Sequence, residues 1–259
     1  MILLVDMEHP REIQRGAPCA QTGEDPRAAR EAYVQDIRRR LEDCSGDRCV
    51  ARPYREVNER WLKSEGPAAL ILSGNVADWD DYDPAELEPL KHVVRAASLP
   101  ILGLCGGLQF IALAHGVEVG PIRPLADGES DVGAEFGGGY LKEWGYTAVD
   151  VLVDDDPVFG RLTGRDRPPV FLEAHYCEAK EVPDGFELLA STPTSQVQAI
   201  RRSGTMVYGT QFHPEAYIVD PGDDQNCLIR HVYPEGYPAR EPDGHQFLTS
   251  FFRAAGIRR

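Results

Sequence analysis

A cysteine flanked by glycines carries the sharpest chemical signal in the chain. Residues 100–109 read PILGLCGGLQ, so an apolar run ends in Gly103-x-Cys105-x-Gly107 just before a helix-like segment. A strand–turn–helix of this kind exposes a nucleophile on a turn so tight that its neighbours must lack side chains. The thiol then sits at a helix N-terminus, where the dipole favours the reactive thiolate, and the N–H of Gly106 faces an oxyanion. The pattern predicts a nucleophilic cysteine; the motif alone leaves a buried structural cysteine as the alternative.

A histidine and a carboxylate follow about a hundred residues downstream. Residues 208–215 read YGTQFHPE, with His213 at the end of a strand-like run and Glu215 two residues later. Because residues i and i+2 of an extended segment face the same side, the carboxylate can orient the imidazole that takes the thiol proton. A lone His-Pro-Glu is typical of a surface turn, but its occurrence with Cys105 favours a Cys–His–Glu triad. The order nucleophile, histidine, acid argues against an ordinary α/β-hydrolase.

Alternating short elements must position these side chains. In the N-terminal half we expect strands over residues 1–8, 49–54, 68–73 and 100–105 and helices over 27–43, 57–64, 86–97 and 107–115. Strands that alternate with helices through short connections indicate a parallel α/β sheet. We therefore predict a flavodoxin-like open, mostly parallel central sheet with helices on both faces.

The second half of the chain has a different texture. We expect a glycine-rich loop over 128–139, strands over 147–153, 168–176, 186–191, 197–201 and 206–212, and a closing helix over 244–255. These strands predict a strand-rich C-terminal extension of the sheet. Because no linker-like segment divides the halves, residues 1–259 are expected to form a single domain with insertions at about 9–27 and 216–244, both irregular.

The two motifs resemble those of the class I, triad-type glutamine amidotransferases. The family's Gly-x-Cys-x-Gly-x-Gln matches residues 103–109, and its Gln-Phe-His-Pro-Glu run matches 211–215. Residues 70–75 (LILSGN) lie where the family has its oxyanion-strand Ser-Gly-Gly, and 171–189 resembles its histidine-containing strand with the following Pro-x-Gly-Phe segment. The resemblance covers roughly 68–216.

The resemblance implies hydrolysis of a glutamine-type amide. Cys105 would attack the side-chain carbonyl, His213 would take the thiol proton and pass one to the leaving ammonia, and Glu215 would hold the histidine tautomer. A γ-glutamyl thioester would form, and water would release glutamate. The substrate is then glutamine or another γ-glutamyl amide, and a separate synthetase is the implied protein partner for the ammonia.

The resemblance also implies an oxyanion hole and a substrate site. The N–H of Gly106, with an N–H near Gly74 or Asn75, would stabilise the tetrahedral oxyanion, while Gln109 and the backbone near Tyr176 would hold the amino-acid end of the substrate. Asn75 departs from the family, which has glycine there; asparagine tolerates positive φ better than most residues, but less well than glycine.

Three further features leave alternatives open. The acidic run 78–83 (DWDDYD) has no counterpart in the family pattern, and a solvated loop is its simplest interpretation. Because some γ-glutamyl hydrolases also replace the second oxyanion-loop glycine, a stand-alone γ-glutamyl hydrolase or peptidase is the alternative enzyme. A non-catalytic regulatory binding subunit is the alternative of another class, against which the intact triad residues argue.

Composition excludes several other functions. The 259 residues carry 27 Lys and Arg against 42 Asp and Glu, a net charge of −15, which disfavours binding to nucleic acid or to anionic membranes. No stretch reaches the length of a membrane span, and six scattered cysteines without an export signal indicate reduced thiols in the cytoplasm. No cofactor or metal is expected. His175 and Cys177 on one strand could be ligands, but a packed strand histidine is the simpler interpretation, and Cys227 and His231 lack a third and fourth ligand nearby.

Overall fold

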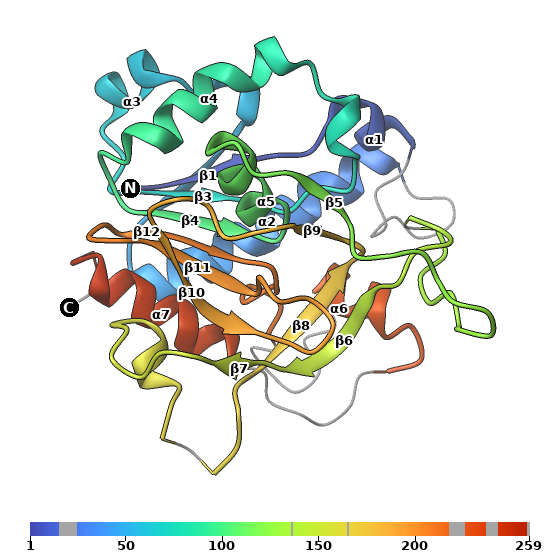
Figure 1. Ribbon diagram of the computed structural model, residues 1–259. Coiled ribbons are helices and arrows are strands. Elements are labelled where there is room, and N and C mark those ends of the chain that lie inside the picture. Colours follow the sequence, from blue (N-terminus) through green and yellow to red (C-terminus); the bar gives the residue numbers. More distant parts are fainter. Residues whose placement is uncertain (16–24, 136, 165, 218–225, 237–242, 258–259) are drawn as a thin grey trace.

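A computed structural model of the chain shows a central sheet covered by helices on both faces (Figure 1). The structure describes residues 1–15, 25–135, 137–164, 166–217, 226–236 and 243–257. Within these ranges, no helix is long and apolar enough to cross a membrane.

Five parallel strands form the half of the sheet that carries the two motifs. Their order is β2-β1-β3-β4-β12, which is the flavodoxin-like order, and β11, β10 and β7 continue the sheet with antiparallel pairing. The eight strands, in the same order across the sheet, are Cys49–Pro53, Ile2–Asp6, Ala69–Leu72, Ile101–Leu104, Val207–Thr210, Ala199–Arg202, Phe186–Ser191 and Asp150–Val151. Because the parallel strands run the same way, their carboxyl ends meet at one edge, on the right of Figure 1.

Both faces of the sheet are buried, which is why its strands read as continuous apolar runs. In β1, Ile2 and Leu4 face a core that contains α2 and α7, whereas Leu3 and Val5 face a core that contains α4 and α5. The helices are α1 (Pro10–Arg15), α2 (Pro26–Ser45), α3 (Glu59–Glu65), α4 (Pro84–Ala96), α5 (Gly106–Ala114), α6 (Cys227–Val232) and α7 (Gly244–Ala254). Short 3-10 helices are η1 (Tyr54–Glu56), η2 (Trp79–Asp81) and η3 (Phe159–Arg161).

Two small antiparallel ribbons lie beside the large sheet. One pairs β5 (Val119–Pro121) with β9 (Cys177–Ala179), and the other pairs β6 (Glu143–Ala148) with β8 (Val170–His175). An isolated bridge between Leu172 and His213 brings β8 against the segment that follows β12. The ribbons therefore flank the same edge of the sheet as the two motifs.

Three predicted segments, 9–27, 147–153 and 216–244, differ in kind from the structure. The segments 9–27 and 216–244 were expected to be irregular, but they contain α1 and α6, and their residues 16–24, 218–225 and 237–242 lie outside the described ones. Asn226 caps α6 by accepting a hydrogen bond from the N–H of Ile229, so capping and tertiary packing favour a helix too short to show a sequence period.

The predicted strand 147–153 is instead two strands, β6 and β7. β6 begins four residues earlier, at Glu143, because its pairing with β8 extends through Gly145 and Trp144.

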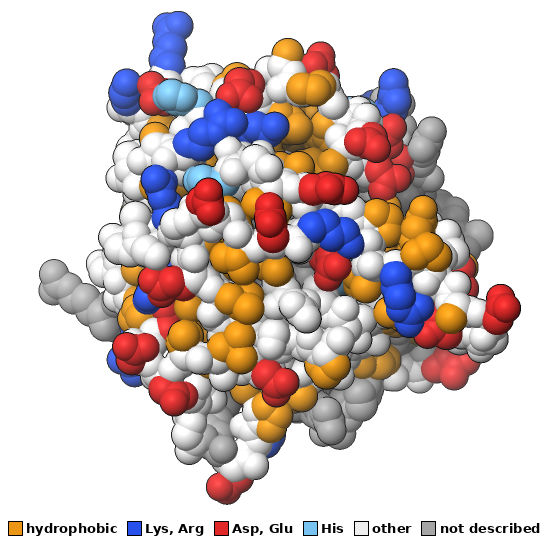
Figure 2. Space-filling view, viewed as in Figure 1, with side chains coloured by type: hydrophobic (Ala, Val, Ile, Leu, Met, Phe, Trp, Pro, Cys, Tyr) orange, Lys and Arg blue, Asp and Glu red, His pale blue; other side chains and the backbone are white. Residues whose placement is uncertain are grey.

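Figure 2 shows one face of the molecule, on which acidic side chains gather near α1 and η2 at the upper right.

Candidate active site

Cys105 sits on a turn that excludes side chains from its neighbours. It follows β4 directly and precedes α5, with φ 49° and ψ −104°, a conformation that residues other than glycine rarely adopt. A Cβ on Gly103 would overlap the backbone of Gly107, and one on Gly107 would overlap the backbone of Leu72. The strained turn and its obligatory glycines therefore aim the thiol out of the strand end, as predicted for a nucleophile.

His213 lies against this thiol, and Glu215 pairs with its imidazole. The Nδ1 of His213 is 2.8 Å from Oε1 of Glu215, and a Cβ on Gly74 would lie 3.3 Å from Cε1 of His213 and 3.6 Å from Cβ of Cys105. Burial alone would lower the pKa of His213, but the charges of Glu215 and Cys105, with hydrogen bonds to both, raise it well above its ordinary value. With Nδ1 engaged by the carboxylate, Nε2 is the nitrogen left to exchange a proton with the thiol.

The segment after β3 approaches the turn from the other side. A Cβ on Gly106 would overlap the amide oxygen of Asn75, so these two predicted oxyanion residues are adjacent. The hydroxyl of Ser73 donates to the carbonyl of Gly74 at 2.9 Å, and the amide of Asn75 donates to the carbonyl of Ala77 at 2.7 Å. The bond from Ser73 fixes the orientation of the peptide between Gly74 and Asn75. The bond from Asn75 holds the loop over the start of α5.

Glu8 supports the same loop and was missed by the sequence analysis. Its carboxylate accepts hydrogen bonds from the N–H groups of Val76, at 3.1 Å, and Ala77, at 3.3 Å, while Arg30 lies 3.6 Å away. Burial raises the pKa of Glu8, and Arg30 and the two N–H groups oppose the shift. The available signal was its position just after β1, since sites in parallel sheets gather at the carboxyl ends of strands.

Gln109 is brought to the site but is already engaged by protein groups. Its Nε2 donates to the carbonyl of Cys177 at 2.8 Å and to Oε1 of Gln211 at 3.2 Å, and its Oε1 accepts from the indole of Trp79 at 2.9 Å. Gln211, which the sequence analysis named only as part of a motif, donates to the thiol of Cys105 at 3.4 Å. The two glutamines thus connect the thiol to β9.

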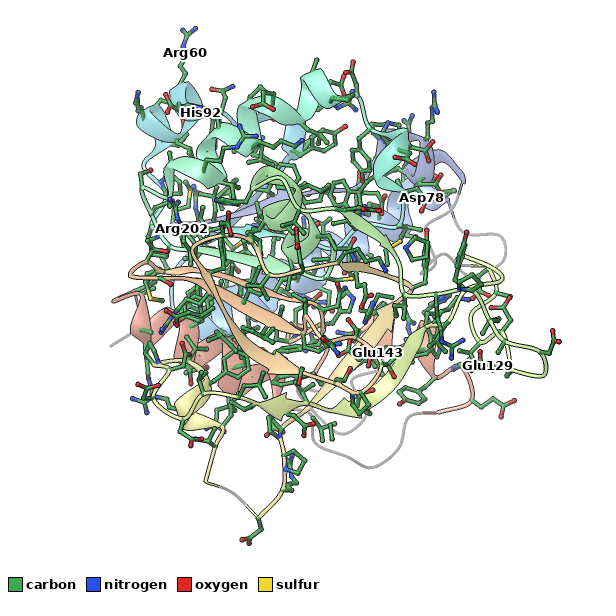
Figure 3. The ribbon with its side chains drawn as sticks, in the orientation of Figure 1. Arg60, Asp78, His92, Glu129, Glu143 and Arg202 are labelled. Atoms are coloured by element: carbon green, nitrogen blue, oxygen red, sulfur yellow. The ribbon has the colours of Figure 1, made fainter. Side chains whose placement is uncertain are left out.

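Tyr176 closes one side of the pocket beside Cys105. The pocket is lined by residues 75–79, Cys105, Gln109 and residues 174–177. The hydroxyl of Tyr176 donates to Asp78 across the pocket, and its ring stacks on Tyr140 with centroids 6.1 Å apart. Figure 3 places Asp78 on the side of the molecule where α1 and η2 lie. The structure therefore brings together all eight predicted site residues and adds Asp78 and Trp79 from the acidic run.

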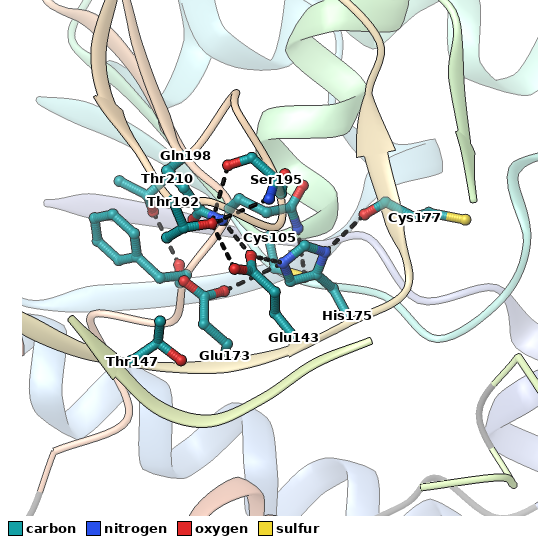
Figure 4. Close-up of polar contacts among 12 residues, drawn as sticks. Cys105, Glu143, Thr147, Glu173, His175, Cys177, Thr192, Ser195, Gln198 and Thr210 are labelled. Carbon is teal, nitrogen blue, oxygen red and sulfur yellow. Dashed lines mark hydrogen bonds and ion pairs between the residues drawn. The ribbon is translucent and has the colours of Figure 1, made fainter. Parts of the chain in front are cut away.

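A buried polar cluster lies behind the pocket (Figure 4). Nε2 of His175 is 3.0 Å from Glu143 and 3.3 Å from Glu173, and its Nδ1 donates to the carbonyl of Cys177 at 2.9 Å. The three side chains could offer ligand atoms to a metal, but Glu143 already accepts hydrogen bonds from Thr192 and Gln198. Burial raises the pKa of Glu173 to about 7. Burial also opposes the charged form of His175, but the two neighbouring carboxylates raise the pKa of His175 to about 10.

The raised pKa of Glu173 predicts a pH-dependent stability. The pKa of this carboxyl rises from 4.5 to about 7 on folding, so the folded state binds the proton more tightly than the unfolded state. The stabilisation from this proton is complete below pH 4.5 and is lost as pH rises through 7. The side chain of Glu173→Gln is neutral at every pH and does not lose this stabilisation. Between pH 4.5 and pH 8, the free energy of unfolding of Glu173→Gln should therefore increase by about 3 kcal/mol relative to that of the wild type. Urea denaturation across this range measures the difference.

Glu143→Gln provides the matched control. It removes the carboxylate that pairs with buried His175 and accepts from Thr192 and Gln198, so it should destabilise the protein at every pH below about 10. A wild-type and a Glu173→Gln protein whose stabilities change in parallel with pH would contradict the assignment.

The comparisons with known proteins agree with the two motifs. Residues 29–226 match the family model described as "Glutamine amidotransferase class-I". The chain belongs to this family. It is 35% identical over 157 residues to a subunit of the glutamine-hydrolyzing GMP synthase from Haloarcula marismortui, covering 60% of this chain and 68% of that protein. It is 32% identical over 184 residues to the "GMP synthase [glutamine-hydrolyzing]" of Herminiimonas arsenicoxydans, covering 70% of this chain.

This class-I amidotransferase chain spans 31% of the Herminiimonas protein, so it matches about a third of that longer relative. Among solved structures, a Thermoplasma acidophilum protein superposes with a TM-score of 0.63 at 24% identity, covering 98% of this chain and 93% of that chain. At that identity the likeness concerns the fold alone. It agrees with the mostly parallel central sheet and its helices on both faces.

Proposed function

We propose that this amidotransferase chain hydrolyses the side-chain amide of glutamine and supplies the ammonia to a separate synthetase. One observation carries the proposal: Cys105 is held at φ 49° on the turn into α5, with the His213–Glu215 pair against it. A cysteine kept in a strained conformation beside an oriented histidine is the arrangement of an activated nucleophile.

Each residue has a role in the proposed reaction. The Cys105 sulfur attacks the amide carbonyl carbon as His213 takes its proton, and the tetrahedral oxyanion is stabilised by the N–H groups of Gly106 and Asn75. Collapse of this intermediate breaks the C–N bond, and His213 gives its proton to the leaving ammonia. Water, deprotonated by His213, then hydrolyses the γ-glutamyl thioester to glutamate, while Glu215 keeps the imidazole in one tautomer.

The comparisons support a partner. Relatives named as subunits of GMP synthase make a nucleotide synthetase the first partner to test, with glutamine as the substrate. We further propose that residues 1–259 act as a single domain in the cytoplasm, with β11, β10 and β7 as a strand-rich C-terminal extension of the flavodoxin-like sheet. The thiols of Cys49, Cys105 and Cys177, which form no disulfide among the described residues, suit a reducing compartment.

Substrate turnover tests the proposal directly. Release of ammonia and glutamate should be measured from glutamine and from a panel of γ-glutamyl amides. Glutamine as the best substrate supports the amidotransferase, whereas preference for a substituted γ-glutamyl amide favours the stand-alone hydrolase that Asn75 leaves open. Absence of release from every amide, with and without a synthetase, would leave a non-catalytic binding role.

Partner dependence gives a second expected result. We expect the isolated chain to turn over glutamine at least about tenfold more slowly than the chain with its synthetase, because we propose that binding of the synthetase reorients the peptide between Gly74 and Asn75. Such a flip breaks the bond from Ser73 to the carbonyl of Gly74. Ser73→Ala should therefore lower the ratio of glutamine turnover with the synthetase to turnover without it, measured by glutamate release. High turnover of the isolated wild-type chain, unchanged by any synthetase, would contradict this expectation.

A further inference from the structure

Asp78 occupies a special place in the pocket beside Cys105. Of the described residues that line this pocket, it is the one carboxylate, and none is lysine or arginine. It lies at the exposed rim, just before η2, whereas the thiol of Cys105 is buried. A substrate whose amide reaches the thiol therefore leaves its other end near Asp78.

Trp79, which follows Asp78, limits how Gln109 can bind the other end of the substrate. Trp79 donates its indole N–H to Oε1 of Gln109, and both polar ends of the Gln109 amide are engaged by protein groups. Glutamine carries an α-ammonium group that needs acceptors, and a carboxylate is the strongest acceptor that a side chain offers. With Gln109 engaged, the side-chain acceptors that the described lining presents are Asp78 and the unpartnered Oδ1 of Asn75, and Asp78 is the charged one.

Tyr176 orients this carboxylate toward the pocket. Its hydroxyl donates to Oδ1 of Asp78 from the opposite wall, and no other described residue hydrogen-bonds the carboxylate of Asp78, whose backbone carbonyl accepts from the N–H of Asp81. The second oxygen, Oδ2, is thus available for a cationic group. Oδ1 accepts from a phenol, and no described lysine, arginine or histidine forms an ion pair with Asp78, so a cationic group of the substrate would not compete with another cation.

We propose that Asp78 binds the α-ammonium group of the amide substrate, so that the site selects γ-amides with a free amino group; this inference rests on the proposed function for the identity of the substrate. The acidic run 78–83 therefore contributes a specificity residue rather than only a solvated loop. Tyr176 acts through Asp78 as a positioning residue.

Equilibrium binding to a Cys105→Ala chain tests the proposal without turnover. The ligands are L-glutamine and glutaramate, the same γ-amide without the α-amino group. In this background Asp78→Asn should raise the dissociation constant of glutamine about tenfold and leave that of glutaramate unchanged. Asp80→Asn is the matched control: it removes the same charge from η2, but Asp80 does not line the pocket, so it should change neither constant.

Four outcomes would overturn the proposal. If Asp78→Asn weakens the binding of both ligands equally, Asp78 has a structural role. If Asp78→Asn and Asp80→Asn have equal effects on glutamine binding, the cause is only the long-range electrostatic effect of the lost charge. An unchanged glutamine constant, or no glutamine binding to the parent chain, would also refute it. A chain that binds glutamine through Asp78 but releases no ammonia would instead refute the proposed function and keep this inference.

Discussion

Cys105→Ala is expected to lower glutamine hydrolysis by at least about 10⁴-fold while the fold survives. Loss of a nucleophile from a triad removes covalent catalysis altogether, and only binding and oxyanion stabilisation remain. Alanine also lacks the thiol but fits the same turn, so circular dichroism and thermal unfolding should resemble those of the wild type. Full activity in this variant would show that another group performs the chemistry.

Chemical labelling provides the control for this variant. A glutamine-analogue diazo ketone should modify Cys105 and spare the other thiols, as read by mass spectrometry of peptides. Burial raises the pKa of Cys49 and of Cys177 to about 12, so both stay protonated near neutral pH and react slowly. Equal labelling of several cysteines would contradict the assignment of Cys105 as the nucleophile.

The sequence predicted the parallel half of the fold because its signals are local. Apolar runs of four or five residues, such as Ala69–Leu72 and Ile101–Leu104, are buried on both faces, and the helices between them are long enough to show a period. The resemblance to class I amidotransferases, carried by Cys105 and His213, is confirmed by the family match. The roles of the individual site residues stay predictions.

The remaining features depend on contacts that no local pattern encodes. Glu8 acts on the N–H groups of Val76 and Ala77, which are nearly seventy residues away in sequence. The acidic run looked like a solvated loop because its charges dominate the sequence, yet Asp78 and Trp79 turn into the pocket. Sequence spacing could not reveal that they meet Tyr176 and Gln109 there.

His213 and Glu215 should contribute unequally to the reaction. His213→Ala removes the group that takes and returns the proton, so turnover should fall by about 10³-fold or more. Glu215→Gln keeps a side chain of the same shape beside Nδ1, and the Cys–His pair can still function. We therefore expect its turnover to exceed that of His213→Ala by about tenfold to hundredfold, since orienting carboxylates cost less to remove than nucleophile or base.

The titration of His213 separates an orienting carboxylate from a merely structural one. The charge of Glu215 is a main cause of the raised pKa of His213, so Glu215→Gln should lower that pKa, as followed by NMR of labelled histidine. The lower pKa leaves less imidazolium to pair with the thiolate, so the loss of turnover in Glu215→Gln should grow as pH rises. A variant that loses turnover equally at every pH, with an unchanged His213 pKa, would show that Glu215 does not act through this imidazole.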